Sequence, residues 1–105
     1  MRTMRLVVMF DLPTGNRAER KTYSLFRKFL VEDGYTMHQF SVYTRILLSR
    51  DNADTHVKRL KEHVPTAGSV TVFMLTEKQF EDRIVLVDTR PGQPIDLGAQ
   101  LTLVF

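Results

Sequence analysis

The order of apolar and polar residues along the chain predicts a series of strands and amphipathic helices. Residues 4–11 form the first apolar run, and both of its strand parities are apolar: Leu6, Val8 and Phe10 share one, and Val7 and Met9 share the other. A strand with two apolar faces is covered on both sides. We therefore predict a buried central strand that ends at the carboxylate of Asp11, just before a Pro/Gly turn.

The residues after this turn follow a helical period. Asn16 is suited to cap a helix, with Glu19 three residues later as in a capping box. The helix is predicted to extend to about Asp33, before the stop signal of Gly34. Its buried stripe is predicted from the apolar residues that share one face, which are Ala18, Thr22, Leu25, Phe26 and Phe29.

A second amphipathic helix is predicted in the middle of the chain. Asp51 or Asn52 caps it, and it extends to about Val64, where a Pro/Gly segment ends it. Its inner stripe is predicted to contain Ala53, Val57, Leu60 and Val64. His56 and His63 lie seven residues apart on one edge of this helix, which favours boundary positions over metal ligands.

The other apolar segments predict short strands. They are residues 35–44 and 45–48, joined by a tight connection around Tyr43 to Arg45, and then residues 69–75, 84–87 and 101–105. One helical turn is predicted at residues 76–80. Two prolines bar regular structure from residues 89–94, which are predicted to be a linker. The chain is thus predicted to have a domain over residues 1–88, followed by a linker and a C-terminal strand over residues 89–105.

The order strand, helix, strand, strand, helix, strand is typical of the α+β ferredoxin-like fold, βαββαβ, here with extra C-terminal strands. In this fold both helices cover one face of the sheet. The first and fourth strands, however, are apolar at both parities. A second apolar sheet face requires a second sheet, which another copy of the chain would supply. We therefore expect a homodimer packed sheet against sheet.

The overall composition narrows the class of protein. A chain of 105 residues with a net charge of +3 is one domain whose mild basic excess permits nucleic acid as a partner. The absence of cysteine excludes disulfides and thiolate metal sites. No apolar run approaches the length needed to span a membrane, so we expect a cytoplasmic protein with no membrane partner.

Asp11 is the residue with the most evident chemistry. One carboxylate forms neither a metal site nor an acid/base pair, but two copies in a dimer could approach each other. Mg²⁺ accepts one or two carboxylates, with water and substrate phosphate at the remaining positions, and such an ion can activate water against a phosphodiester. The alternative is structural: Asp11 ends the strand and bonds the amides of the turn.

Basic residues gather on the face of the first helix opposite its apolar stripe. Arg17, Arg20, Arg27 and Lys28 lie there without an acidic residue among them. The face is either an ordinary solvated surface or a site for phosphates close to Asp11. Phe40 and Tyr43 could stack bases, although core or interface packing is the default for such aromatic residues.

Three segments resemble one known family. They are Phe10-Asp11-Leu12-Pro13, the basic helical run at residues 20–30, and the segment at residues 34–43 that contains Gln39-Phe40-Ser41-Val42-Tyr43. In this order they are similar to the small CRISPR-associated endonuclease family, the second protein of the CRISPR adaptation pair and partner of the spacer integrase. The likeness covers about residues 4 to 88, and residues 76–80 resemble members linked to type II systems.

The resemblance implies a ferredoxin-like homodimer that holds a divalent ion, Mg²⁺ or Mn²⁺, between the strand-end aspartates. It implies metal-dependent cleavage of RNA or DNA in some members and a role beside the integrase in acquiring spacers. By position, Asp11 is the metal ligand and catalytic residue, Arg20 a basic residue of the helix, and Tyr43 an accessory aromatic. Phe10 stands where many members have tyrosine, so a hydroxyl is missing there.

Three functions remain open from the sequence. The first is a nucleic-acid-binding adaptation subunit with Mg²⁺-dependent endonuclease activity on RNA or DNA. The second is a non-catalytic scaffold that holds duplex DNA by its phosphates. The third is a ferredoxin-like regulatory module that binds a small molecule at its dimer interface.

Overall fold

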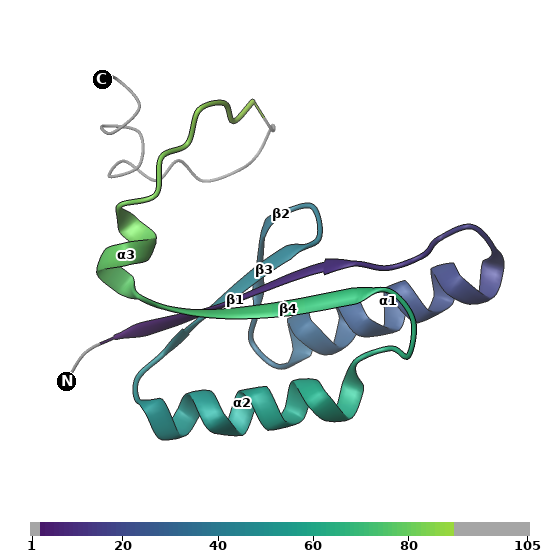
Figure 1. Ribbon diagram of the computed structural model, residues 1–105, viewed down its shortest axis with the longest axis horizontal. Helices are drawn as coiled ribbons and strands as arrows, with labels where there is room; N and C mark the ends of the chain where they lie inside the picture. Colours follow the sequence, from purple (N-terminus) through teal and green to yellow (C-terminus); the bar gives the residue numbers. More distant parts are fainter. Residues whose placement is uncertain (1–2, 90–105) are drawn as a thin grey trace.

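The computed structural model describes residues 3–89, which form a four-stranded antiparallel sheet with two long helices on one face (Figure 1). The elements in chain order are β1 (Met4–Asp11), α1 (Arg17–Glu32), β2 (Thr36–Gln39), β3 (Val42–Leu47), α2 (Arg50–His63), β4 (Ser69–Thr76) and α3 (Glu77–Glu81). The strand order β2-β3-β1-β4 is that of a ferredoxin-like α+β fold, which confirms the predicted fold class. The predicted central position of β1 is also confirmed.

The hydrophobic core lies between the sheet and the two long helices. Leu6, Val8 and Phe10 alternate along β1 toward the helices, where they meet Phe26 and Leu30 of α1. Alternation follows from the period of two in a strand, and it leaves the opposite parity of β1 on the face without long helices.

The hairpin between β2 and β3 turns earlier than predicted. The connection lies at Phe40 and Ser41, not around Tyr43 to Arg45, and Ser41 has the left-handed φ of 61°. Tyr43 is buried within β3 and stacks against Phe10 with ring centroids 5.8 Å apart. Packing of this ring against β1 therefore keeps Tyr43 inside a strand, which local pattern alone did not reveal.

The buried stripe of α1 is rotated from the predicted one. Phe26 and Leu30 are buried, whereas Leu25 is 57% exposed, so its predicted place in the stripe is wrong. Ala18 and Thr22 are also exposed. Figure 1 shows the reason, because the first turns of α1 extend past the end of the sheet and only the later turns lie against it.

The predicted start of α1 is confirmed and that of α2 is wrong. The Asn16 side chain accepts a hydrogen bond from the Glu19 amide at 2.8 Å, while the Glu19 carboxylate reaches back to the Gly15 amide. α2 is capped by Ser49, whose hydroxyl accepts from the Asn52 amide at 3.2 Å, instead of by Asp51 or Asn52. A serine with extended backbone satisfies a free amide just as an acid does.

The segment after α3 does not form the strand predicted at residues 84–87. Ile84, Leu86 and Val87 are exposed, and no strand within residues 3–89 pairs with them. Their apolar pattern predicted a strand, but a strand needs a partner edge, and none reaches them in the part of the chain described here. The predicted linker beyond residue 89 and the strand at residues 101–105 lie outside the described residues.

The short helix α3 covers one end of the sheet face that the long helices leave open. Phe80 is buried there between the guanidinium groups of Arg5 and Arg83, at 4.1 and 4.2 Å from its ring centroid. Arg5 also pairs with Glu77 at 2.7 Å. The other end of this face is uncovered, and Met9 and Phe73 are 44% and 47% exposed. Within residues 3–89, no helix has the length and apolar character to cross a membrane.

Candidate functional site

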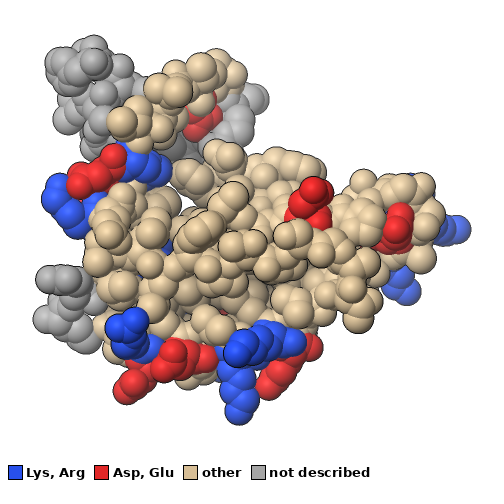
Figure 2. All heavy atoms as spheres, in the orientation of Figure 1, with Lys and Arg blue, Asp and Glu red and all other residues tan. Residues whose placement is uncertain are grey.

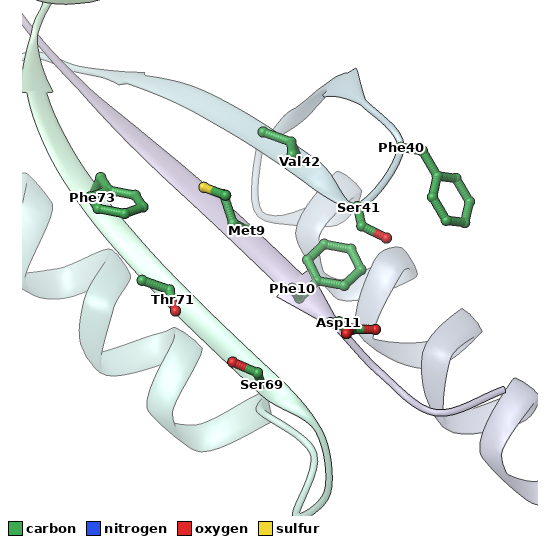
Figure 3. Close-up of a pocket in the computed structure, with 9 residues that line it drawn as sticks. All are labelled: Met9, Phe10, Asp11, Phe40, Ser41, Val42, Ser69, Thr71 and Phe73. Carbon is green, nitrogen blue, oxygen red and sulfur yellow. The ribbon is translucent and has the colours of Figure 1, made fainter.

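A shallow groove of about 290 Å³ lies on the uncovered end of the sheet face, where β1 ends (Figure 3). It is lined by residues of β1, β4 and the β2–β3 turn, which are Met9, Phe10, Asp11, Phe40, Ser41, Val42, Ser69, Thr71 and Phe73. Its ionisable group is the Asp11 carboxylate, and the hydroxyl groups are those of Ser41, Ser69 and Thr71. The sequence did not indicate these hydroxyl groups, because they come together only through strand pairing.

The Asp11 carboxylate is exposed in this groove. Within residues 3–89 it forms no ion pair and accepts no side-chain or backbone hydrogen bond. The structural alternative, in which Asp11 bonds the amides of the following turn, is therefore not what the described residues show. An exposed carboxylate without internal partners is available for a cation or a hydrogen-bond donor from outside the chain.

The backbone at Asp11 is nevertheless closely held. Asp11 pairs with Ser69 in the β1–β4 register, and Leu12 beside it is buried. Gly68 packs directly against this point with φ +91°, and a Cβ on it would lie only 2.6 Å from the Asp11 carbonyl oxygen. Only glycine adopts this φ readily and fits this space. The structure therefore presents a free carboxylate on a fixed backbone.

Among the described residues that line the groove, Asp11 supplies the one carboxylate for a metal ion. No group of three or more His, Asp or Glu residues is gathered within residues 3–89. Mg²⁺ is commonly held by one or two carboxylates together with substrate phosphate and water. The unpaired Asp11 carboxylate suits such a site, and a second carboxylate would have to come from another copy of the chain.

The predicted basic residues of α1 are all exposed, but they differ in their contacts. Arg27 Nε donates to the Tyr43 hydroxyl at 2.7 Å, and Arg20 Nη1 donates to the Thr14 carbonyl at 3.4 Å. Lys28 lies 3.9 Å from Glu32 on the open helix surface. Figure 2 shows blue side chains at the tip where α1 begins, and basic and acidic side chains mixed along α2.

The two possible accessory aromatics, Phe10 and Tyr43, belong to the core. Both rings face the helices, on the side of the sheet opposite Asp11, and Phe10 also packs edge-on against Phe26 at 5.2 Å. Tyr43 acts on the basic face indirectly, because its hydroxyl holds the Arg27 guanidinium in place.

A buried ionic cluster on the helix side of the sheet is absent from the sequence predictions. His56 is buried, whereas the sequence predicted a position between the buried and exposed faces of α2. Its Nδ1 is 2.8 Å from Asp33 Oδ2. Arg59 Nη1 donates to Asp33 Oδ1 at 2.7 Å, and Arg45 donates to the Asp33 carbonyl. His56 and Arg59 lie three residues apart on α2, which was the available signal for a shared partner.

Electrostatics at this cluster stabilise the Asp33 carboxylate. Burial alone raises the pKa of Asp33, but hydrogen bonds and charge from His56 and Arg59 outweigh burial and hold that pKa below its usual value. Burial raises the pKa of nearby Tyr35 to about 12, and the charge of Asp33 adds to the rise. The cluster joins the end of α1 to α2, so we assign it to the scaffold of the fold.

Comparison with protein families gives one match over most of the chain. The family model described as CRISPR associated protein Cas2 matches residues 4–83. A protein of Acidovorax ebreus named CRISPR-associated endoribonuclease Cas2 is 51% identical over 84 residues, which are 80% of this chain and 82% of that protein. A protein of the same name from Streptococcus mutans is 48% identical over 79% of this chain and 76% of its own length.

Comparison with solved structures supports the fold. A chain described as the crystal structure of Cas2 superposes with a TM-score of 0.59 at 23% sequence identity. The match covers 90% of this chain and 99% of that chain. At this level of identity the superposition supports the ferredoxin-like arrangement of strands and helices.

Proposed function

The chain belongs to the CRISPR-associated Cas2 family, and from that premise we propose that it is a metal-dependent endonuclease of CRISPR adaptation in which Asp11 is the catalytic carboxylate. The observation that carries the proposal is the exposed Asp11 carboxylate, which has no partner within residues 3–89 although its backbone is fixed. Because the similar proteins are named endoribonucleases, single-stranded RNA is the first substrate to test and DNA the second.

The proposal includes a homodimer formed sheet against sheet. Met9, Phe73 and Ile46 are exposed apolar residues of the same sheet face as Asp11. A second copy on this face would cover them and bring two Asp11 carboxylates together. Such an interface should bury more than about 1,200 Å² in total, and light scattering at micromolar concentration should give a dimer mass. A monomer mass there would remove the shared metal site.

Two Asp11 carboxylates would be the protein ligands of a Mg²⁺ or Mn²⁺ ion. When bound, such an ion polarises a phosphodiester and makes water a stronger nucleophile. In this site the Asp11 carboxylate would hold the ion, and the hydroxyl groups of Ser69 and Thr71 face the groove as hydrogen-bond donors. Arg20 is exposed on α1 and neutralises phosphate charge along the bound nucleic-acid strand.

The test is cleavage of a labelled single-stranded RNA and a matched DNA during titration with Mg²⁺ and Mn²⁺. Asp11→Asn keeps the shape of the side chain and removes its charge, so cleavage should fall by roughly a hundredfold or more. The matched control is Asp54→Asn on α2, which is exposed and should cleave like the wild type. Equal rates in Asp11→Asn and wild type would refute the catalytic assignment.

A second function, a non-catalytic scaffold that binds DNA beside the integrase, is favoured by the exposed basic side chains of α1. Binding should then be independent of base sequence and sensitive to salt, because phosphate contacts release counterions. The double variant Arg20→Glu, Arg27→Glu should bind DNA more weakly, and its affinity should depend less on salt. Deletion of residues 95–105 should weaken binding to the integrase. The alternative of a small molecule bound at the dimer interface stays a prediction.

A further inference from the structure

Phe40 is the most exposed aromatic side chain of the groove. It lies at the tip of the β2–β3 hairpin and is 79% exposed, whereas Phe73 on the opposite wall is 47% exposed. In Figure 3 its ring lies at the edge of the groove, beyond Ser41 and away from the strands. A large exposed ring on a groove with a candidate catalytic carboxylate requires an explanation beyond stability.

The hairpin holds this ring in a defined place. The Phe10 amide donates to the Ser41 carbonyl at 3.0 Å, which ties the turn to the end of β1. The Tyr23 and Ser41 hydroxyl groups are 3.1 Å apart, and the Tyr23 ring stacks beside Phe40 with centroids 6.1 Å apart and planes at 21°. One face of Phe40 is thus supported by the protein, so little conformational entropy would be lost when a ligand stacks on the other.

Two arginines of α1 flank the Tyr23 position of this aromatic pair. Arg20 and Arg27 lie three residues before and four residues after Tyr23 on α1, so they share its side of the helix. Arg27 is further fixed by the Tyr43 hydroxyl. Aromatic rings between cations are the arrangement that binds single-stranded nucleic acid, in which cations contact phosphates and rings stack with bases.

We propose that Phe40 stacks on an unpaired base next to the phosphodiester that lies at Asp11, and thereby selects single-stranded over duplex nucleic acid. The inference rests on the proposed function, and it assigns Phe40 a positioning role in that site. A base inside a duplex has both faces covered by its neighbours, so only an unpaired base can use the free face of Phe40.

The first experiment uses fluorescence, because the chain contains no tryptophan. Phe40→Trp in an Asp11→Asn background gives a single tryptophan in a protein that we expect not to cleave its ligand. Added single-stranded oligo-uridine RNA should quench this tryptophan, and a strand of the same length made of abasic units should not. The control is Leu25→Trp, an exposed position on the other side of α1, which should respond to neither strand.

The second experiment measures affinity by anisotropy in the same background. Phe40→Ala should weaken binding of oligo-uridine by about 5- to 150-fold, the range for loss of one stacked base, and binding of the abasic strand by less than twofold. Phe40→Trp should restore the loss and Phe40→Leu should not. A general defect in folding would weaken both strands equally, so the contrast between them isolates the stack.

Three results would overturn the inference. RNA that binds without quenching Phe40→Trp, and with unchanged affinity for Phe40→Ala, shows that the ring does not stack; cleavage by the wild type would then leave the proposed function intact. A Phe40→Ala protein that loses its dimer mass in light scattering shows that the ring belongs to the interface between copies. Absence of binding of both single-stranded RNA and single-stranded DNA by the wild type would overturn both the inference and the proposed function.

Discussion

Asp11 ends the buried strand β1 and Asp33 follows the last turn of α1, yet the surroundings of their two carboxylates are opposite. Asp33 has an 8% exposed side chain that is held by His56 and Arg59 at 2.8 and 2.7 Å. Asp11 is exposed and has no partner for its carboxylate within residues 3–89. A carboxylate that stabilises a fold is satisfied by that fold, whereas one that binds a ligand keeps its oxygens free.

The two sites also differ in what holds them. At Asp33 the side chain itself is the link between α1 and α2. At Asp11 it is the backbone that is held, through pairing with Ser69 and contact with Gly68. The Asp11 side chain takes no part in these contacts. The difference predicts that the same substitution affects stability at one position and activity at the other.

The largest expected effect on stability comes from Asp33→Asn. It removes a buried charge and leaves His56 and Arg59 without their carboxylate partner, which costs about 3 kcal/mol of unfolding free energy. Asp11→Asn should change that free energy by no more than about 0.5 kcal/mol. Urea unfolding followed by circular dichroism measures both. Comparable losses in the two variants would contradict the division of roles.

Gly68→Ala should cause the next largest loss of unfolding free energy, because it disturbs the backbone that fixes Asp11. Its Cβ would lie 2.6 Å from the Asp11 carbonyl oxygen and the residue keeps φ +91°, so we expect a loss of about 2 kcal/mol. The control is Gly15→Ala, where the nearest atom is the flexible Glu19 carboxylate at 3.3 Å. Gly68→Ala should also lower cleavage where the protein remains folded; full activity would show that Asp11 does not depend on this contact.

Arg27→Gln should cause a smaller loss of unfolding free energy. This loss should distinguish Arg27 from Arg20, the other arginine near Tyr23 on α1. It leaves the buried Tyr43 hydroxyl without its donor at a cost of about 1 kcal/mol, while Arg20→Gln should cost less than about 0.5 kcal/mol. In a Tyr43→Phe background the Arg27 effect should largely vanish, and unfolding of the double variant measures this. An undiminished effect would place the role of Arg27 elsewhere.

The smallest expected effect is a change in how stability depends on pH. The pKa of Asp33 is lowered in the folded state from an ordinary value of 3.8, so the stability it adds is present above pH 3.8 and is lost as pH falls through and below that value. Denaturation between pH 6 and 3 should show this loss in the wild type and in Asp11→Asn. Asp33→Asn should show a shallower decline, and an unchanged slope would mean that Asp33 does not contribute.

Much of the framework followed from local pattern. The alternation in β1, the cap at Asn16 and the apolar run of β4 depend on neighbours within a few residues, so the sequence predicted these elements correctly. The resemblance carried by residues 10–13 and 34–43 likewise indicated the family that the comparisons show. Asp11 was singled out because it is the carboxylate that ends the buried strand, just before a Pro/Gly turn.

What the sequence by itself determined, then, was the order of elements, the fold class and the candidate carboxylate, since each depends on short-range periodicity and residue type. Only the tertiary structure decided that the hairpin turns at Phe40 and Ser41 and that Leu25 is exposed while His56 is buried. It also decided which aspartate is satisfied and which is free. These outcomes depend on contacts between residues distant in the chain, such as His56 with Asp33 or Gly68 with Asp11. The energy of such contacts cannot be derived from the pattern of neighbouring residues.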